Sequence, residues 1–198
     1  MEQSSFIFAC HKGDLQTAQN LKQNHPNIII SFRLFLSACE NGHLELAQWL
    51  LQMNPNIDVH VNNNWAFRKA CNYGHFDVAQ WLLQIRPDII HHYNVWIDAF
   101  LSCCTQNNRR NLQVAQWMYQ LKPILKNSMF IEACENDSVS IAYWLHSLNP
   151  FKFNLTIQDY CIDKWNVNNK DAQLFILYAS IYNGYYCQLV PSIVTKFV

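Results

Sequence analysis

Cysteine, glycine and proline recur in one register along most of this 198-residue chain. Five of the eight cysteines lie 29, 32, 33 and 30 residues apart, at positions 10, 39, 71, 104 and 134. Three of the four glycines follow an aligned cysteine by three residues and precede a proline by thirteen; they are Gly13, Gly42 and Gly74, with Pro26, Pro55 and Pro87. Because glycine and proline are the strongest local breaks in a chain, the shared register predicts a stack of repeats about 30 residues long.

The pattern of residues within a repeat predicts two helices that are joined at the glycine. A phenylalanine stands four residues before each aligned cysteine, so the two side chains share one helical face; these are Phe6, Phe35, Phe67, Phe100 and Phe130. Glycine is typical of the left-handed residue that ends such a helix. A second apolar stripe at spacings of three and four follows it. Tryptophan occupies one position of four second helices, at Trp49, Trp81, Trp117 and Trp144. We interpret these side chains as repeat packing rather than as ligand contacts.

The sequence motifs of the repeats resemble those of a known family. Ala-Cys-Glu-Asn-Gly-His-Leu-Glu-Leu-Ala-Gln-Trp-Leu-Leu at 38–51 and its counterpart at 70–83 resemble the centre of an ankyrin repeat. The Ala-Cys and Ala-Gln-Trp-Leu wording is similar to the divergent ankyrin repeats of large DNA viruses. The resemblance covers about residues 4–150 and implies an all-α solenoid of helix-turn-helix repeats. We expect repeats at about 4–31, 32–63, 64–96, 97–126 and 127–150, followed by an irregular segment and a degenerate capping repeat at 151–198.

Two departures from the family pattern affect local structure. The Thr-Pro-Leu-His opening of the family is absent, so we expect helix capping from Asn62 to Asn64 or from Ser31. The fourth repeat carries three extra residues around 107–111 and lacks the glycine. At this point we expect a longer exposed turn with Arg109 and Arg110 in solvent.

The charge balance and the cysteines indicate the setting of the chain. Fourteen Lys and Arg balance fourteen Asp and Glu, which argues against a nucleic-acid binder and a polybasic membrane anchor. No apolar run approaches the about 18 residues of a membrane span, and the N-terminal residues lack a secretory pattern. Aligned cysteines on neighbouring helices would lie about 8–10 Å apart, beyond disulfide reach. We therefore expect a cytoplasmic monomer with reduced core thiols, in the host cytoplasm if the chain is viral.

The same residues give little support for catalysis. No glycine-rich phosphate loop occurs. Cys39 with His43, and Cys71 with His75, have a spacing that would suit a Cys-His or metal site. However, glycine breaks the helix between them, and the resemblance implies histidines that brace the turn. His91-His92 is a weak metal candidate with only Asp88 nearby. We expect no cofactor, no metal and no catalytic residue; the alternative is an enzyme site at 151–176 using Asp159, Cys161 or Asp163.

The resemblance implies a non-enzymatic scaffold for protein–protein interaction. Such repeats bind a protein partner on the concave surface formed by the first helices and by the fingers between repeats. An alternative is a substrate adaptor of a ubiquitin ligase, with a degenerate recruiting element in the C-terminal part. Residues 151–198 offer Leu189-Val190-Pro191 for this role but no Leu-Pro-x-Glu start.

Finger length suggests where the partner binds. The longest intervals from a closing proline to the next aligned phenylalanine are Pro55–Phe67 and Pro87–Phe100, called fingers two and three. Trp65 and Trp96 lie outside the repeated tryptophan position, so we expect them to be partner anchors with Tyr73 and Tyr93; the alternative is that both tuck under their fingers. The expected partner-binding residues are His60, Asn62, Asn63, Asn64, Trp65, Arg68, Lys69, Asn72, Tyr73, His91, His92, Tyr93, Asn94, Trp96, Glu132 and Glu135, beside Ser37 and Glu40.

Overall fold

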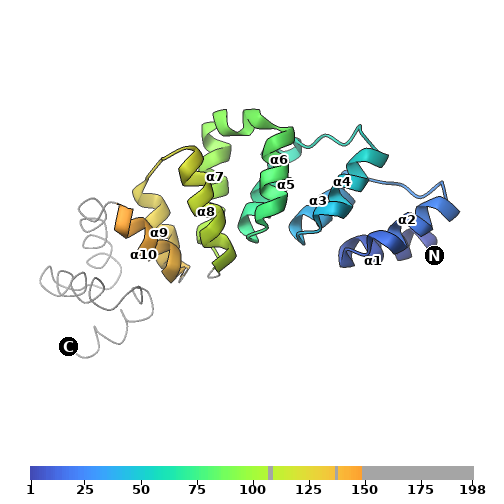
Figure 1. Cartoon of the computed structure of the whole chain (residues 1–198), viewed down its shortest axis with the longest axis horizontal. Coiled ribbons are helices and arrows are strands. Elements are labelled where there is room, and N and C mark those ends of the chain that lie inside the picture. The colour runs from blue at the N-terminus through green and yellow to red at the C-terminus, as the bar shows by residue number, and fades with distance from the viewer. Residues whose placement is uncertain (107–108, 137, 149–198) are drawn as a thin grey trace, which may run out of the picture. The chain divides into compact units, whose positions relative to one another are not determined.

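The structure is a computed structural model that describes residues 1–106, 109–136 and 138–148. All regular structure in these ranges is helical (Figure 1). The elements are α1 Glu2–Lys12, α2 Leu15–Asn24, α3 Phe32–Glu40, α4 Leu44–Met53, α5 Val61–Asn72, α6 Phe76–Ile85, the 3-10 helix η1 Pro87–His91, α7 Tyr93–Cys104, α8 Arg109–Leu121, α9 Asn127–Glu135 and α10 Val139–Leu148. The predicted all-α repeat architecture is confirmed over this part of the chain, whereas the predicted cap at 151–198 lies outside it.

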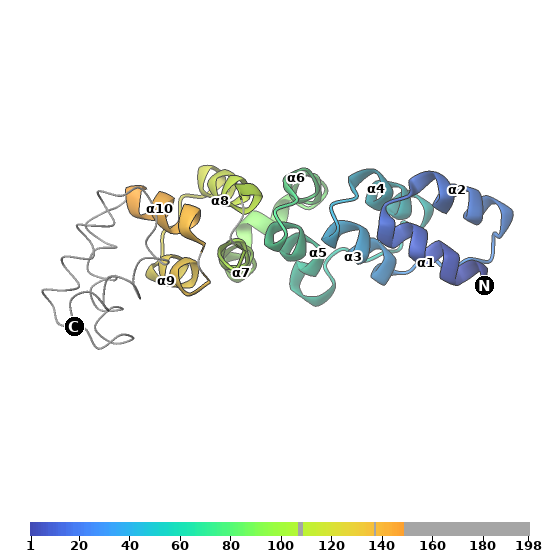
Figure 2. The ribbon, with the colours of Figure 1, turned by 90° about the horizontal axis from the view of Figure 1, so that it is seen from below.

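The chain divides into two compact units, Met1–Ala99 and Phe100–Val198. In the first unit α1 contacts α3 and α3 contacts α5, so these three first helices form one row. Helices α2, α4 and α6 form a second row beside it (Figure 2). We call the outward side of α1, α3 and α5 the first-helix face. Within the described residues no helix is long and apolar enough to cross a bilayer.

Glycine closes the first helix of the first three repeats in the way the spacing predicts. Gly13, Gly42 and Gly74 have φ of 75°, 75° and 70°, the left-handed region that costs glycine little. The N–H of Gly42 donates to the carbonyl of Cys39 at 3.3 Å, and the next N–H donates to Ala38 at 2.9 Å. The side chain of Asn41 adds a hydrogen bond to the Ser37 carbonyl at 2.8 Å, and the second helix starts two residues after the glycine.

The histidine after the glycine joins each repeat to the preceding one. His43 Nε2 lies 3.1 Å from the carbonyl oxygen of His11, and His75 Nε2 lies 2.8 Å from that of Glu40. Because a carbonyl only accepts, Nε2 carries the proton in both rings. The imidazoles also cover the preceding glycines: a Cβ built on Gly42 would come within 2.4 Å of His75 Nδ1. The bracing role implied for these histidines is confirmed.

Aromatic rings fill the junctions between repeats. Phe6 and Phe35 are fully buried. The Trp49 ring lies 6.3 Å from that of Phe6, and Trp81 lies 6.1 Å from Phe35, so a half-buried tryptophan of each repeat covers the phenylalanine of the one before. The packing role predicted for these two tryptophans is confirmed.

The second unit repeats this arrangement. Trp144 of α10 stacks on Phe100 at 6.3 Å and meets the edge of Tyr119 at 5.7 Å. The hydroxyl of Ser138 donates to the carbonyl of Cys104 at 2.6 Å, in the way that histidines brace the first unit. Arg109 and Arg110 are exposed as expected, but they form the first turn of α8 and not a long loop.

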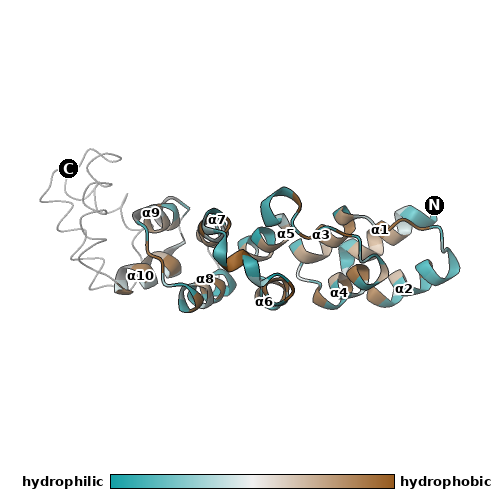
Figure 3. Ribbon diagram, turned by 90° about the horizontal axis from the view of Figure 1, so that it is seen from above, coloured by the Kyte–Doolittle hydropathy of each residue, from teal (hydrophilic) through white to brown (hydrophobic). Residues whose placement is uncertain are grey.

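Two local expectations about helix capping are wrong. Ser31 is the N-cap residue of α3 but its side chain makes no capping hydrogen bond. Helix α5 starts at Val61, before the asparagines that were expected to cap it, and its N-cap residue is His60. Asn62, Asn63 and Asn64 instead form a left-handed turn with φ between 53° and 61°, visible as a hydrophilic loop at the start of α5 (Figure 3).

The repeat cysteines are free thiols buried in the core, at Cys10, Cys39 and Cys71, with Cys103 and Cys104 in α7. Burial raises the pKa of Cys10 to about 11, and it raises the pKa of Cys39 far above the ordinary thiol range. Since the thiolate is the reactive form, iodoacetamide at about pH 8 should leave both residues unlabelled in the native protein and label them in urea. Peptide mass spectrometry measures this, and equal labelling of Cys39 in both states would contradict the assigned burial.

Candidate partner-binding site

A column of three side chains runs along α5 on the first-helix face. Trp65, Lys69 and Tyr73 are spaced by four residues, so they share one side of the helix. Lys69 Nζ lies 5.9 Å from the ring centroid of Trp65 and 5.5 Å from that of Tyr73. It also pairs with Glu40 Oε1 of α3 at 3.3 Å. The ammonium group is therefore held between two rings and one carboxylate, and it fixes both aromatic side chains in place.

A second ion pair continues this arrangement toward α7. Arg68 Nη1 lies 3.6 Å from Asp98 Oδ2. Both ion pairs, Arg68–Asp98 and Lys69–Glu40, are partly exposed and contribute only about 0–1 kcal/mol each to stability. Their main effect is to orient side chains across neighbouring first helices and to balance charge.

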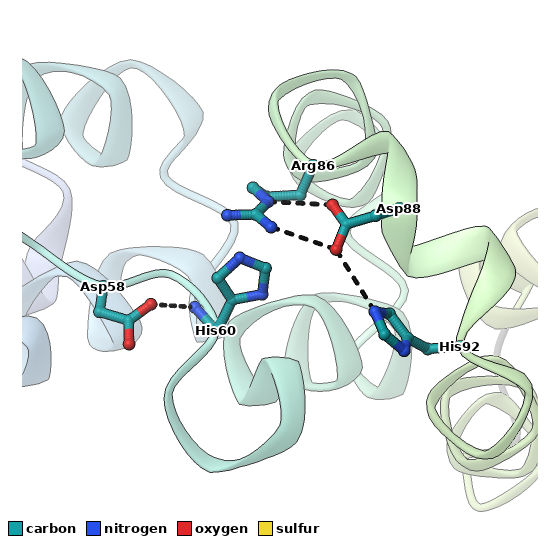
Figure 4. A network of polar contacts seen from close by, with 5 residues as sticks. All are labelled: Asp58, His60, Arg86, Asp88 and His92. Atoms are coloured by element: carbon teal, nitrogen blue, oxygen red, sulfur yellow. Dashed lines mark hydrogen bonds and ion pairs between the residues drawn. The ribbon is translucent and has the colours of Figure 1, made fainter.

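Fingers two and three meet at a polar network (Figure 4). Arg86 donates to both carboxylate oxygens of Asp88, at 3.1 Å each, and His92 Nε2 lies 3.4 Å from Asp88 Oδ2. The N–H of His60 donates to Asp58 at 2.9 Å, and the His60 ring points toward Arg86. The hydrogen bonds from Arg86, supported by the positive charges of Arg86 and His60, lower the pKa of Asp88. The two fingers thus share one charged cluster.

The comparison with known families concerns this same part of the chain. Residues 6–92 match the family model described as "Ankyrin repeats (3 copies)". Over these residues the chain is similar to three successive ankyrin repeats. No curated protein that was compared with the chain matches it. Ankyrin repeats generally serve as protein–protein interaction modules and are typically not enzymes.

Most of the expected partner-binding residues on the ankyrin repeats are accessible. Seven are exposed: Asn62, Asn63, Tyr73, His91, His92, Tyr93 and Asn94. Five are half-buried: His60, Trp65, Arg68, Lys69 and Asn72. The structure brings Trp65, Lys69 and Tyr73 together on α5. His92 pairs with Asp88, and the His60 ring lies near Arg86 beside this pair, at a separate place in the fold.

Two of the expected binding residues are buried, so the expectation for them is wrong. Trp96 is 1% exposed and Asn64 is 5% exposed. Trp96 stacks on Phe67 at 6.2 Å and supplies the ring that Trp49 and Trp81 supply to the two preceding junctions. The sequence held a signal for this: Trp96 stands four residues before Phe100 and therefore shares its core-facing side. The alternative that the tryptophan tucks into the protein is the correct one for Trp96.

The remaining residues belong to the second unit. Glu132 is half-buried and accepts a hydrogen bond from Asn136 Nδ2 at 3.0 Å. The side chain of Glu135 lies outside the described residues. Their grouping with the α5 column stays a prediction.

The described residues offer little for chemistry. In the ranges 1–106, 109–136 and 138–148 no group of three His, Cys, Asp or Glu side chains could hold a metal ion. His91 does not join the Asp88 cluster, which contains His92 and Arg86. Sequence reasoning missed Asp98 as a member of the site, although its place on α7, one turn or less from the core residues Trp96 and Phe100, could have been read from the repeat.

Proposed function

We propose that the chain is a non-enzymatic scaffold that binds a protein partner across the first-helix face of its ankyrin repeats and fingers two and three. One observation carries this proposal: the Trp65–Lys69–Tyr73 column is partly exposed and already held in place by Glu40. Tyrosine and tryptophan are the residue types enriched in interface hot spots. Side chains that are ordered before binding lose less conformational entropy when a partner docks.

The exposed tyrosines mark the two ends of the proposed contact. Tyr73 is 41% exposed at the end of the α5 column, and Tyr93 is 44% exposed at the start of α7. Each tyrosine combines an apolar ring with a hydroxyl at its tip. Such a side chain can be hydrated in the free protein and can be buried with a hydrogen bond in the complex. The proposal needs no net charge on the partner, because Lys69 and Arg68 are already paired.

The source and setting of the chain are part of the same proposal. The Ala-Cys and Ala-Gln-Trp-Leu wording supports a divergent repeat of the large DNA virus type, with a host protein as the partner, host cytoplasm as the location and a monomeric chain. The alternative role as a ubiquitin ligase adaptor depends on residues 151–198, and the alternative enzyme site depends on Asp159, Cys161 or Asp163. Both lie outside the described residues.

Photocrosslinking tests where the partner binds. A photoreactive phenylalanine analogue at Tyr73 or Tyr93 should crosslink one protein from a lysate of the natural host cell. The same analogue at Gln84, an exposed residue of α6 in the second row, should not. A product that forms from Gln84 and from neither tyrosine would place the interface on the second helices.

Alanine substitutions then measure the contribution of the tyrosines. Tyr73→Ala and Tyr93→Ala should each weaken binding of the crosslinked partner by more than about 1 kcal/mol, because each removes a large exposed ring. The melting temperature should stay the same, since neither ring is buried. Isothermal titration calorimetry and thermal unfolding measure the two quantities. Unchanged affinity in both variants would contradict the first-helix assignment.

A further inference from the structure

The edge of the first repeat differs from every following junction of the first unit. Four positions of the second repeat pack against the first: Leu34 and Leu46 are buried, His43 bonds to His11, and Trp49 covers Phe6. The corresponding positions of the first repeat are Ser5, Asp14, Thr17 and Asn20, and all four are exposed. A further repeat of this kind would find neither the apolar side chains nor the histidine that such a junction uses.

This edge opens into a hollow of about 520 Å³. Its lining includes Ser5, Phe8, Ala9, Lys12, Asp14 and Thr17. A volume of this size is in the range of sites that bury a ligand of a few residues. Phe8 is 65% exposed, a large apolar ring at the rim of the hollow that nothing in the described chain covers.

The hollow holds one cation, Lys12, and one anion, Asp14, and the two differ in their hydrogen-bond partners. Both oxygens of Asp14 are satisfied by Thr17, whose N–H donates at 2.9 Å and whose hydroxyl donates at 2.6 Å. These bonds lower the pKa of Asp14 and make it the cap of α2. Lys12 Nζ lies 5.7 Å from the centroid of the Phe8 ring and forms no ion pair within the described residues. The ammonium group of Lys12 therefore has donors left for a carboxylate, whereas both oxygens of Asp14 already accept hydrogen bonds and the Asp14 side chain stays negatively charged.

The third repeat also has a lysine and an aromatic residue one turn apart, and there the lysine pairs with a glutamate. Phe8 and Lys12 stand at the same two positions of α1 that Lys69 and Tyr73 occupy on α5, so each helix presents one lysine and one aromatic ring a turn apart. Lys69 has the carboxylate of Glu40 beside it. Among the described residues, Lys12 has the same kind of aromatic neighbour but no such acid.

We propose that the hollow binds a short extended segment of a protein partner, with an Asp or Glu carboxylate on Lys12 and an adjacent apolar side chain on Phe8. The lysine, which makes no ion pair within the described residues, selects an acidic residue, and the exposed ring selects an apolar one next to it. The site is separate from the Tyr73 and Tyr93 contact and does not depend on it.

A random octapeptide library displayed on phage provides the probe. It is selected on the full chain and counter-selected on the Lys12→Glu variant. Enriched peptides should carry Asp or Glu next to Leu, Ile or Phe. The most enriched peptide, labelled with fluorescein, should bind about tenfold more weakly to Lys12→Glu and to Phe8→Ser. Lys12→Arg should keep the affinity, because it preserves the charge.

Matched controls separate the site from general charge effects. Arg109→Glu makes the same charge change at an exposed residue of the second unit and should leave peptide binding unchanged. Circular dichroism should show unaltered folding, since Phe8 and Lys12 are exposed. The proposal is overturned if the selected peptides lack acidic residues, or if Lys12→Glu binds them as the natural chain does. It is also overturned if no peptide is selected while vesicles of phosphatidylcholine and phosphatidylserine bind the chain through Lys12.

Discussion

Replacing Phe35 with alanine should lower the free energy of unfolding by about 3–5 kcal/mol. The side chain is fully buried, and the Trp81 ring lies against it at 6.1 Å. Alanine would leave a cavity between two repeats that rigid helices do not close. Because a domain has only about 5–15 kcal/mol of stability, such a loss would bring the chain near to unfolding. Urea titration followed by circular dichroism measures the change.

Phe8→Ala is the matched control, since it removes the same ring from an exposed position of a first helix. Its effect should stay within about 0.5 kcal/mol, the range of ordinary surface substitutions. If the Phe35 and Phe8 variants lost similar stability, the assignment of Phe35 to the junction between repeats would be wrong.

Gly42→Ala should cost about 1.5–3.5 kcal/mol of unfolding free energy, as the sum of two effects. The left-handed backbone, with φ of 75°, penalises a side chain by about 1–2 kcal/mol. The new Cβ would also come within 2.4 Å of His75 Nδ1 and displace the ring. Displacement would break the hydrogen bond from His75 to the Glu40 carbonyl, which contributes about 0.5–1.5 kcal/mol. Thermal and urea unfolding of the variant measure the sum.

A double-mutant cycle with His75→Ala separates the two causes. In the His75→Ala background the space beside Gly42 is open, so Gly42→Ala should cost only the backbone part, about 1–2 kcal/mol. If Gly42→Ala cost the same in both backgrounds, the position of the His75 ring would not depend on residue 42 lacking a side chain. The explanation that Gly42 makes room for the bracing histidine would then be wrong.

Much of the fold could be predicted because its determinants are local. The glycine turns, the helix pairs and the Phe–Cys face follow from spacings of three and four residues, which the helix geometry imposes. The bracing by His43 and His75 followed from a resemblance, and the tryptophan packing followed from identical placement in several repeats. The candidate site was predicted in part: Trp65, Lys69 and Tyr73 do share the accessible side of α5.

The features that the sequence did not predict depend on which side chains of neighbouring helices contact each other. Tryptophan placement outside the repeat position predicted an exposed anchor at Trp96, yet this ring covers Phe67 because the junction needs a ring there. Asparagine composition predicted a helix cap at 62–64, whereas the chain turns through these residues in a left-handed conformation. The ion pair of Lys69 with Glu40, and the lack of an ion pair for Lys12 among the described residues, likewise depend on contacts between helices.

The sequence by itself determined where each helix pair turns and which side of each first helix enters the core, because both depend on residues within one turn of each other. The tertiary structure alone decided which aromatic ring covers which junction and which lysine of the described first helices keeps an unpaired charge. The physical reason is that packing and ion pairing join residues about 30 positions apart, and a repeat spacing predicts that such residues are neighbours but not which of their side chains meet.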